Sequence, residues 1–226
     1  MLMKSQNTNA GHRRHGASGF SLTELLIIMT IIIIMSSFAA MSAGPLMKEQ
    51  RLNNAYNTTV SAMRQAHDQA VAQRTSYSVT FANHTGAPSD IVVAPSLRAG
   101  MPGYTGELNT VTYTLPKDVT FLAQTGLPTD KTKVPDGYGS GAPAIDFGYT
   151  ASGSGTGGAA TVYFCPDGSS QANDAGQCTT NWSGGVVYLA QSGNVMNTRA
   201  VTLWGGTGRI RGWRLTNSGG LQWIRQ

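Results

Sequence analysis

The hydrophobic positions of the chain begin with a long uncharged run. From Leu25 to Ala43, 19 residues carry no charge, and most are Ile, Leu, Met, Phe or Ala. At about 1.5 Å per residue, the run approaches the ~20 residues that a helix needs to cross a bilayer core. The pattern therefore predicts a transmembrane helix, with the basic residues Lys4, Arg13 and Arg14 holding the N-terminus in the cytoplasm.

A second helical pattern follows the run. Gly44-Pro45 is expected to interrupt or kink the helix, because proline lacks the amide donor. Apolar positions then step by three and four residues, which is typical of an amphipathic helix. Together the two segments predict a helix of about 55 residues, and we expect His67 to be packed rather than to bind a ligand. The stepping positions are Leu52, Tyr56, Val60, Met63, His67 and Ala70.

After Arg74 the period of the pattern changes to two. Tyr77–Phe81 alternates apolar and polar residues, as a half-buried strand does. Residues 123–160 are rich in Gly, Pro, Ser and Thr and indicate surface loops. A long helix followed by short strands predicts an α+β fold: a helix with a transmembrane half and an amphipathic half, packed on an antiparallel β-rich head. Further predicted strands are Ile91–Ala94, Val111–Leu115, Val119–Leu122, Ala144–Phe147, Thr161–Phe164, Val186–Ala190, Ala200–Trp204, Arg209–Leu215 and Leu221–Ile224.

The small residues Gly16–Gly19 stand before the apolar run. In a secretory signal peptide they would follow the run, so that cleavage would discard it. Cleavage at Gly19 would instead leave the apolar helix at the new N-terminus. The expected division is a leader at 1–19, an apolar helix at 20–43, an amphipathic helix at 44–74 and an exported head at 75–226.

The stretch Gly19-Phe20-Ser21-Leu22-Thr23-Glu24 resembles the processing site of type IV pilins and type II secretion pseudopilins. The resemblance implies that prepilin peptidase cuts after Gly19, that Phe20 is N-methylated, and that other pilin or pseudopilin subunits are partners. The head is similar to the GspH/FimT group of minor pilins. The expected location is the bacterial inner membrane, as a single-pass protein with a cytoplasmic N-terminus before cleavage and a periplasmic or extracellular head.

Glu24 is a carboxylate at the head of the apolar run. On insertion scales such a group costs roughly 2.5–3.5 kcal/mol in lipid. In the family that it resembles, the carboxylate pairs with the N-terminal amine of a neighbouring subunit, here that of Phe20. We therefore interpret Glu24 as a filament-assembly residue, and the alternative is a glutamate snorkelling at the edge of a plain anchor.

Composition favours an exported head. Only 12% of the residues are charged, and the two cysteines, Cys165 and Cys178, stand 13 positions apart. In an oxidising compartment this spacing favours a disulfide that closes a loop of about 14 residues, worth roughly 3 kcal/mol in the chain-entropy model. Metal binding is the alternative, but no further ligand spacing accompanies the cysteines.

The C-terminal segment is basic. After Asp174 no acidic residue follows, and Arg209, Arg211 and Trp213 alternate along one predicted strand. Guanidinium groups two residues apart on a strand approach the spacing of successive phosphates, and an indole can stack on a base. The Gly-Arg-x-Arg pattern resembles that of FimT-like minor pilins that bind DNA during natural transformation. DNA would then contact Arg209, Arg211 and Arg214, and a structural role for this strand is the alternative.

No catalytic or phosphate-binding motif is present, so we expect no enzyme activity, cofactor or metal. Three hypotheses remain. The chain is a minor pilin or pseudopilin subunit of a type IV pilus or a type II secretion pseudopilus, a pilin that captures DNA, or a plain anchored domain.

Overall fold

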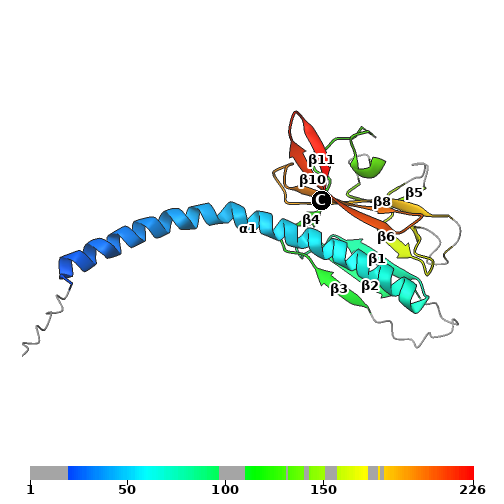
Figure 1. The fold of residues 1–226 in the computed structure, drawn as a ribbon, viewed down its shortest axis with the longest axis horizontal. Helices are drawn as coiled ribbons and strands as arrows, with labels where there is room; N and C mark the ends of the chain where they lie inside the picture. Colours follow the sequence, from blue (N-terminus) through cyan, green and yellow to red (C-terminus); the bar gives the residue numbers. More distant parts are fainter. Residues whose placement is uncertain are drawn as a thin grey trace, which may run out of the picture. The chain divides into compact units, whose positions relative to one another are not determined.

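The computed structural model describes residues 20–96, 110–130, 132–139, 143–150, 157–172, 178 and 181–226, except for the side chains of 39–43. One long helix, α1 (Leu22–Gln73), has 52 residues and precedes the strands (Figure 1). The chain divides into two compact units at Gly44/Pro45, and α1 contributes to both. The helix continues through Pro45 rather than ending there.

No helix in the described part of the chain is long and apolar enough to cross a membrane. The predicted fold class, with its transmembrane half, is therefore wrong, and so is the predicted location as a single-pass protein of the inner membrane. Thr30, Ser36 and Ser37 are polar residues within the apolar run.

Antiparallel sheets dominate the second unit, Pro45–Gln226. One sheet has the order β3-β2-β1-β6-β7, and the other has the order β11-β10-β9-β8-β4, with β5 also paired to β8. The short 3-10 helix η1 (Pro135–Gly137) precedes β5. The strands are β1 (Tyr77–Ala82), β2 (Asp90–Pro95), β3 (Val111–Thr114), β4 (Thr120–Phe121), β5 (Ile145–Thr150), β6 (Thr161–Phe164), β7 (Ser170–Gln171), β8 (Ser183–Ala190), β9 (Thr198–Trp204), β10 (Arg209–Asn217) and β11 (Leu221–Arg225).

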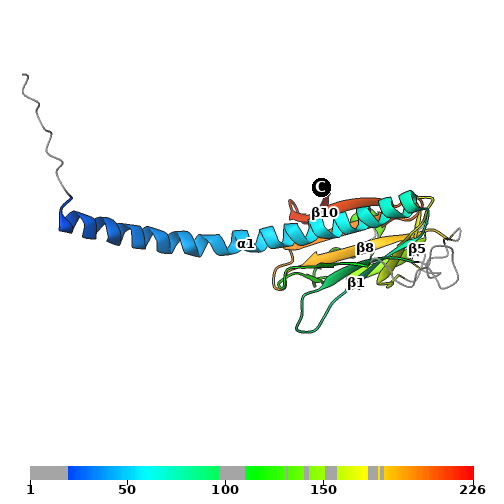
Figure 2. The same cartoon turned by 90° about the horizontal axis from the view of Figure 1, so that it is seen from below.

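The second part of α1 lies along the sheets, as Figure 2 shows. Leu52 and Met63 on the stripe predicted from the sequence are buried there, in the same cluster as Phe81. The ring of Phe81 contacts those of Phe121 and Phe147, each at a centroid distance of 5.5 Å. These aromatic contacts join β1, β4 and β5, so the main core lies between the helix and both sheets.

The helix and β10 meet at a strand glycine. A Cβ on Gly212 would overlap the ring and hydroxyl of Tyr56 on α1. Residues of β10 therefore divide between two environments: Ile210 and Gly212 face the helix, whereas Arg211 and Trp213 face the opposite side.

Candidate functional sites on the N-terminal helix and the basic strand

The first candidate site is the N-terminal part of α1. Its described large apolar side chains, from Phe20 to Met47, are 43% to 80% exposed. They occupy consecutive positions, such as Ile31–Ile34, and so cover every side of the helix rather than one stripe. Glu24 lies in the first turn and is the only charged side chain between Phe20 and Met47. The predicted cleavage residue Gly19 lies outside the described residues.

The start of the helix has its own local cause. Ser21 and Glu24 have the spacing of a capping box, and a carboxylate in the first turn is favoured by the helix dipole. The hydroxyls of Ser21 and Thr23 are hydrogen-bonded at 2.8 Å, and the Leu25 amide donates to the Ser21 carbonyl. The same residues that resemble a processing site therefore also begin the helix.

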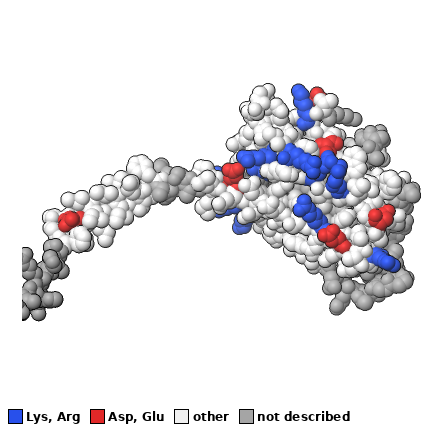
Figure 3. Space-filling model, in the orientation of Figure 1, with Lys and Arg blue, Asp and Glu red and all other residues white. Residues whose placement is uncertain are grey.

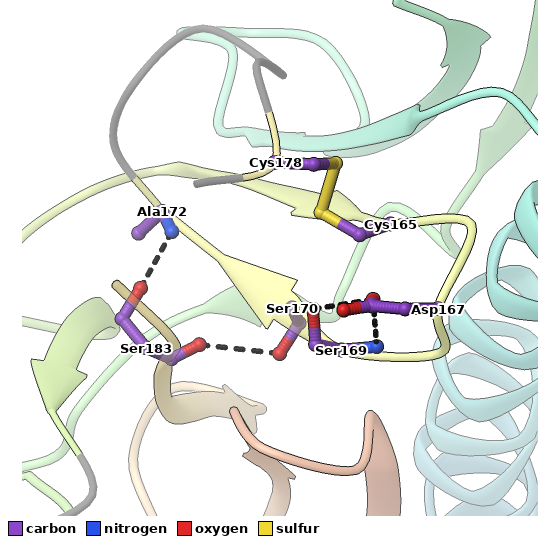
Figure 4. Close-up of a disulfide and its surroundings, with 7 residues drawn as sticks. All are labelled: Cys165, Asp167, Ser169, Ser170, Ala172, Cys178 and Ser183. Carbon is purple, nitrogen blue, oxygen red and sulfur yellow. Dashed lines mark hydrogen bonds between the residues drawn. A yellow bond between two sulfur atoms is a disulfide. The ribbon is translucent and has the colours of Figure 1, made fainter. Parts of the chain in front are cut away.

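The two cysteines are joined in the head. Cys165 and Cys178 form a disulfide with a Cα–Cα distance of 5.7 Å (Figure 4). Beside it, the Asp167 carboxylate accepts bonds from the amide and the hydroxyl of Ser169, and these bonds lower the pKa of Asp167. Ser183 binds the same segment to β8 by accepting a bond from the Ala172 amide at 2.6 Å. The bridge thus joins the β6–β7 turn, at Cys165, to Cys178, which follows β7 in the chain. The sequence pattern missed β7 because this strand has only two residues.

The second candidate site is the basic strand β10. A row of blue Lys and Arg side chains crosses the head in Figure 3. The structure separates the three predicted DNA-binding arginines, because Arg214 lies on the helix-facing side and binds Glu49 at 3.4 Å. Arg209 is exposed and has no ion pair among the described residues.

Arg211 is not available as a free cation. Its guanidinium donates to Asp136 of η1, and both side chains are mostly buried, at 20% and 12% exposure. The other Asp136 oxygen accepts a bond from the Thr202 hydroxyl, which in turn accepts one from Nε1 of Trp213 at 2.9 Å. Sequence reasoning missed this network because Asp136 lies 75 residues before Arg211, in a predicted loop.

A second buried arginine, Arg199, lies on β9, the strand paired with β10. Arg199 of β9 is 2% exposed and donates to Asn53 of α1 at 3.1 Å. Burial lowers its pKa, and Glu49 at 3.7 Å offsets part of that effect. Glu49 thus faces two arginines, Arg199 and Arg214, and links α1 to the sheet. The excess of C-terminal arginine that the sequence shows is therefore partly structural.

Comparison with protein-family models, with curated proteins and with solved structures found no match. A function for this chain therefore has to be inferred from its own residues. Two features indicate a function. One is the exposed apolar helix with its single glutamate, and the other is the basic strand β10, in which Asp136 neutralises Arg211.

Proposed function

We propose that the chain is a filament subunit, a minor pilin or pseudopilin of a type IV pilus or a type II secretion pseudopilus. The observation that carries the proposal is the N-terminal part of α1, which is apolar on all sides and exposed. A helix that is hydrophobic all round needs an apolar environment all round. Exposed apolar surfaces larger than a few hundred Å² mark interaction sites.

The occupant that we propose around this helix is the same segment of other subunits. A bundle of such helices would bury the side chains from Phe20 to Met47, and each buried CH₂ would contribute about 0.8 kcal/mol. In that environment an unpaired Glu24 carboxylate would be costly, whereas the amine of a processed neighbouring Phe20 would compensate it. Glu24 would therefore fix the register of each subunit against the next.

Processing tests the proposal directly. We expect co-expression with a prepilin peptidase to give a chain that begins at Phe20, because the small residues precede the apolar run. Intact-mass measurement should show the loss of residues 1–19, with or without one methyl group. Gly19→Glu is the matched control and should block cleavage, because a charged side chain would replace hydrogen at the scissile position. An uncleaved wild-type chain would contradict the proposal.

Glu24→Val should leave the head folded and processing intact, and should reduce incorporation into filaments at least tenfold. The reason is that the valine variant loses the pairing with the neighbouring amine, and a tenfold loss corresponds to about 1.4 kcal/mol. Quantitative immunoblotting of sheared filaments measures the effect. Thr23→Val, at the adjacent exposed position, is the control and should incorporate normally. Equal incorporation of both variants would show that the carboxylate has no role in assembly.

DNA capture is the second function that we propose, and the row of basic side chains in Figure 3 favours it. We expect Arg209 rather than Arg211 to contact the DNA phosphates, because Asp136 already neutralises Arg211. Arg209→Gln should reduce the slope of log affinity against log salt by about 0.9, the value of one phosphate contact. Fluorescence anisotropy of labelled duplex DNA over a salt series measures this slope. An unchanged slope would leave the strand with a structural role only.

A further inference from the structure

A cavity of about 520 Å³ lies between the segment before η1 and the β10–β11 hairpin. Figure 1 shows the short green helix η1 next to the red hairpin. The volume falls in the range of small-molecule sites, about 300–1,000 Å³. Neither candidate site described above includes this cavity. It is lined by Thr132, Lys133, Val134, Trp213, Gly219, Gly220, Leu221, Gln222 and Trp223.

Two indoles form the sheet side of the cavity. Trp213 is paired with Arg225 across β10 and β11, and Leu215 is paired with Trp223. Because residues directly opposite each other share a face, Trp213 and Trp223 are diagonal neighbours on one face of the sheet, roughly 7–8 Å apart. Two ring faces at this spacing can contact a ligand about as long as one or two six-membered rings.

One of these indoles is held in place. Nε1 of Trp213 donates to the Thr202 hydroxyl, which donates to Asp136, and Arg211 neutralises Asp136. Asp136 has a left-handed backbone, with φ 51°, which is uncommon for a residue other than glycine, although aspartate adopts it more often than most. Strained backbone of this kind clusters at ligand-binding sites, where the surroundings hold it in place. The network thus fixes both the loop wall and the first indole.

The second indole has an unused donor. Nε1 of Trp223 is buried and has no hydrogen-bond partner among the described residues. Buried indole N–H groups usually find a partner, and an orphaned one indicates a missing acceptor. The segment opposite is fixed by Asp130, which accepts the Thr132 amide on its carboxylate and the Lys133 and Val134 amides on its carbonyl. Lys133 is exposed and brings the only charge among the lining residues.

We propose that this cavity binds a saccharide unit that carries a carboxylate. The C–H faces of a sugar ring match the electron-rich faces of Trp213 and Trp223. A ring hydroxyl or oxygen supplies the acceptor for Nε1 of Trp223, and the exposed Thr132 and Gln222 side chains suit further hydroxyls. The carboxylate pairs with Lys133, which favours an acidic sugar over a neutral one. The proposal does not depend on filament assembly.

The test uses the full chain in mild detergent and tetragalacturonate as the probe, with its fully methyl-esterified form as the uncharged counterpart. Isothermal titration should show binding of the acid at least tenfold tighter than binding of the ester. Lys133→Gln should remove that preference, and Trp223→Phe should weaken both ligands at least threefold, because it deletes the unpaired donor. Trp182→Phe is the control, since Trp182 is 46% exposed and does not line the cavity.

Absence of binding of both saccharides at millimolar concentration would overturn the proposal, as would an affinity unchanged by Lys133→Gln and Trp223→Phe. A single-stranded oligonucleotide that binds with the same dependence on Lys133, while neither saccharide competes, would assign the cavity to nucleic acid instead. Because Lys133 is exposed and Trp223→Phe keeps an aromatic ring, circular dichroism should show both variants folded.

Discussion

Replacing Gly185 by alanine should destabilise the head by about 3–5 kcal/mol. Gly185 lies in β8, which is paired with both β5 and β9 at this point. A Cβ there would lie 2.5 Å from Cα of Phe147 and closer still to the Asp146 carbonyl oxygen. Because backbone atoms in a paired strand cannot rotate away, the strands must separate, and such overpacking costs more than an ordinary core substitution.

Thermal unfolding followed by circular dichroism measures the effect of Gly185→Ala. For a chain of this size, 1 kcal/mol corresponds to about 2–4 °C, so the midpoint should fall by about 6–20 °C. Gly206→Ala is the control, because the nearest atom to its Cβ is a Trp182 ring carbon at 3.5 Å, an ordinary contact. Equal melting temperatures for the two variants would show that β5 and β8 are not paired as described.

Arg211→Gln should lower the free energy of unfolding of the head by about 2–4 kcal/mol. Removing one partner of a buried ion pair leaves the other charge uncompensated, which costs about 3–5 kcal/mol in a fully buried site. The partial exposure of Arg211 and Asp136 reduces that figure. The sequence alone did not indicate this cost, because it did not show Asp136 to be the partner of Arg211.

Chemical denaturation of Arg211→Gln, Asp136→Asn and the double variant separates the ion pair from side-chain packing. The double variant should be more stable than Arg211→Gln, because it leaves no unpaired carboxylate. Arg209→Gln is the matched control on the same face and should change stability by no more than about 0.5 kcal/mol. Equal losses at positions 209 and 211 would contradict the Arg211–Asp136 contact.

Periodicity located most of the elements. The alternation in Tyr77–Phe81 matches β1 and its buried–intermediate pattern, and the predicted strand Thr161–Phe164 coincides with β6. The observed strand ends differ from the predicted ones where a glycine or a polar residue takes part in the hydrogen bonds between strands. β8, for example, begins at Ser183 rather than at Val186 because Gly184 and Gly185 fit between two neighbouring strands. A hydrophobic pattern cannot find such residues, since they carry no apolar side chain.

The candidate sites show a different limit of sequence reasoning. Strand parity correctly placed Arg211 and Trp213 on one face and Arg214 on the other. It could not predict that the loop before β5 returns to that face and supplies Asp136.

The separation of Asp136 from Arg211 has a kinetic consequence. A contact across 75 residues closes a long loop, and its entropic cost must be met before the contact contributes. We therefore expect the Asp136 loop to dock after β9 and β10 have paired, because Thr202 and Arg211 come from those two strands. Trp213, at the end of the same chain of hydrogen bonds, then acquires its final surroundings in a late folding step. Its fluorescence should follow that step, whereas the backbone dichroism of the strands should change earlier.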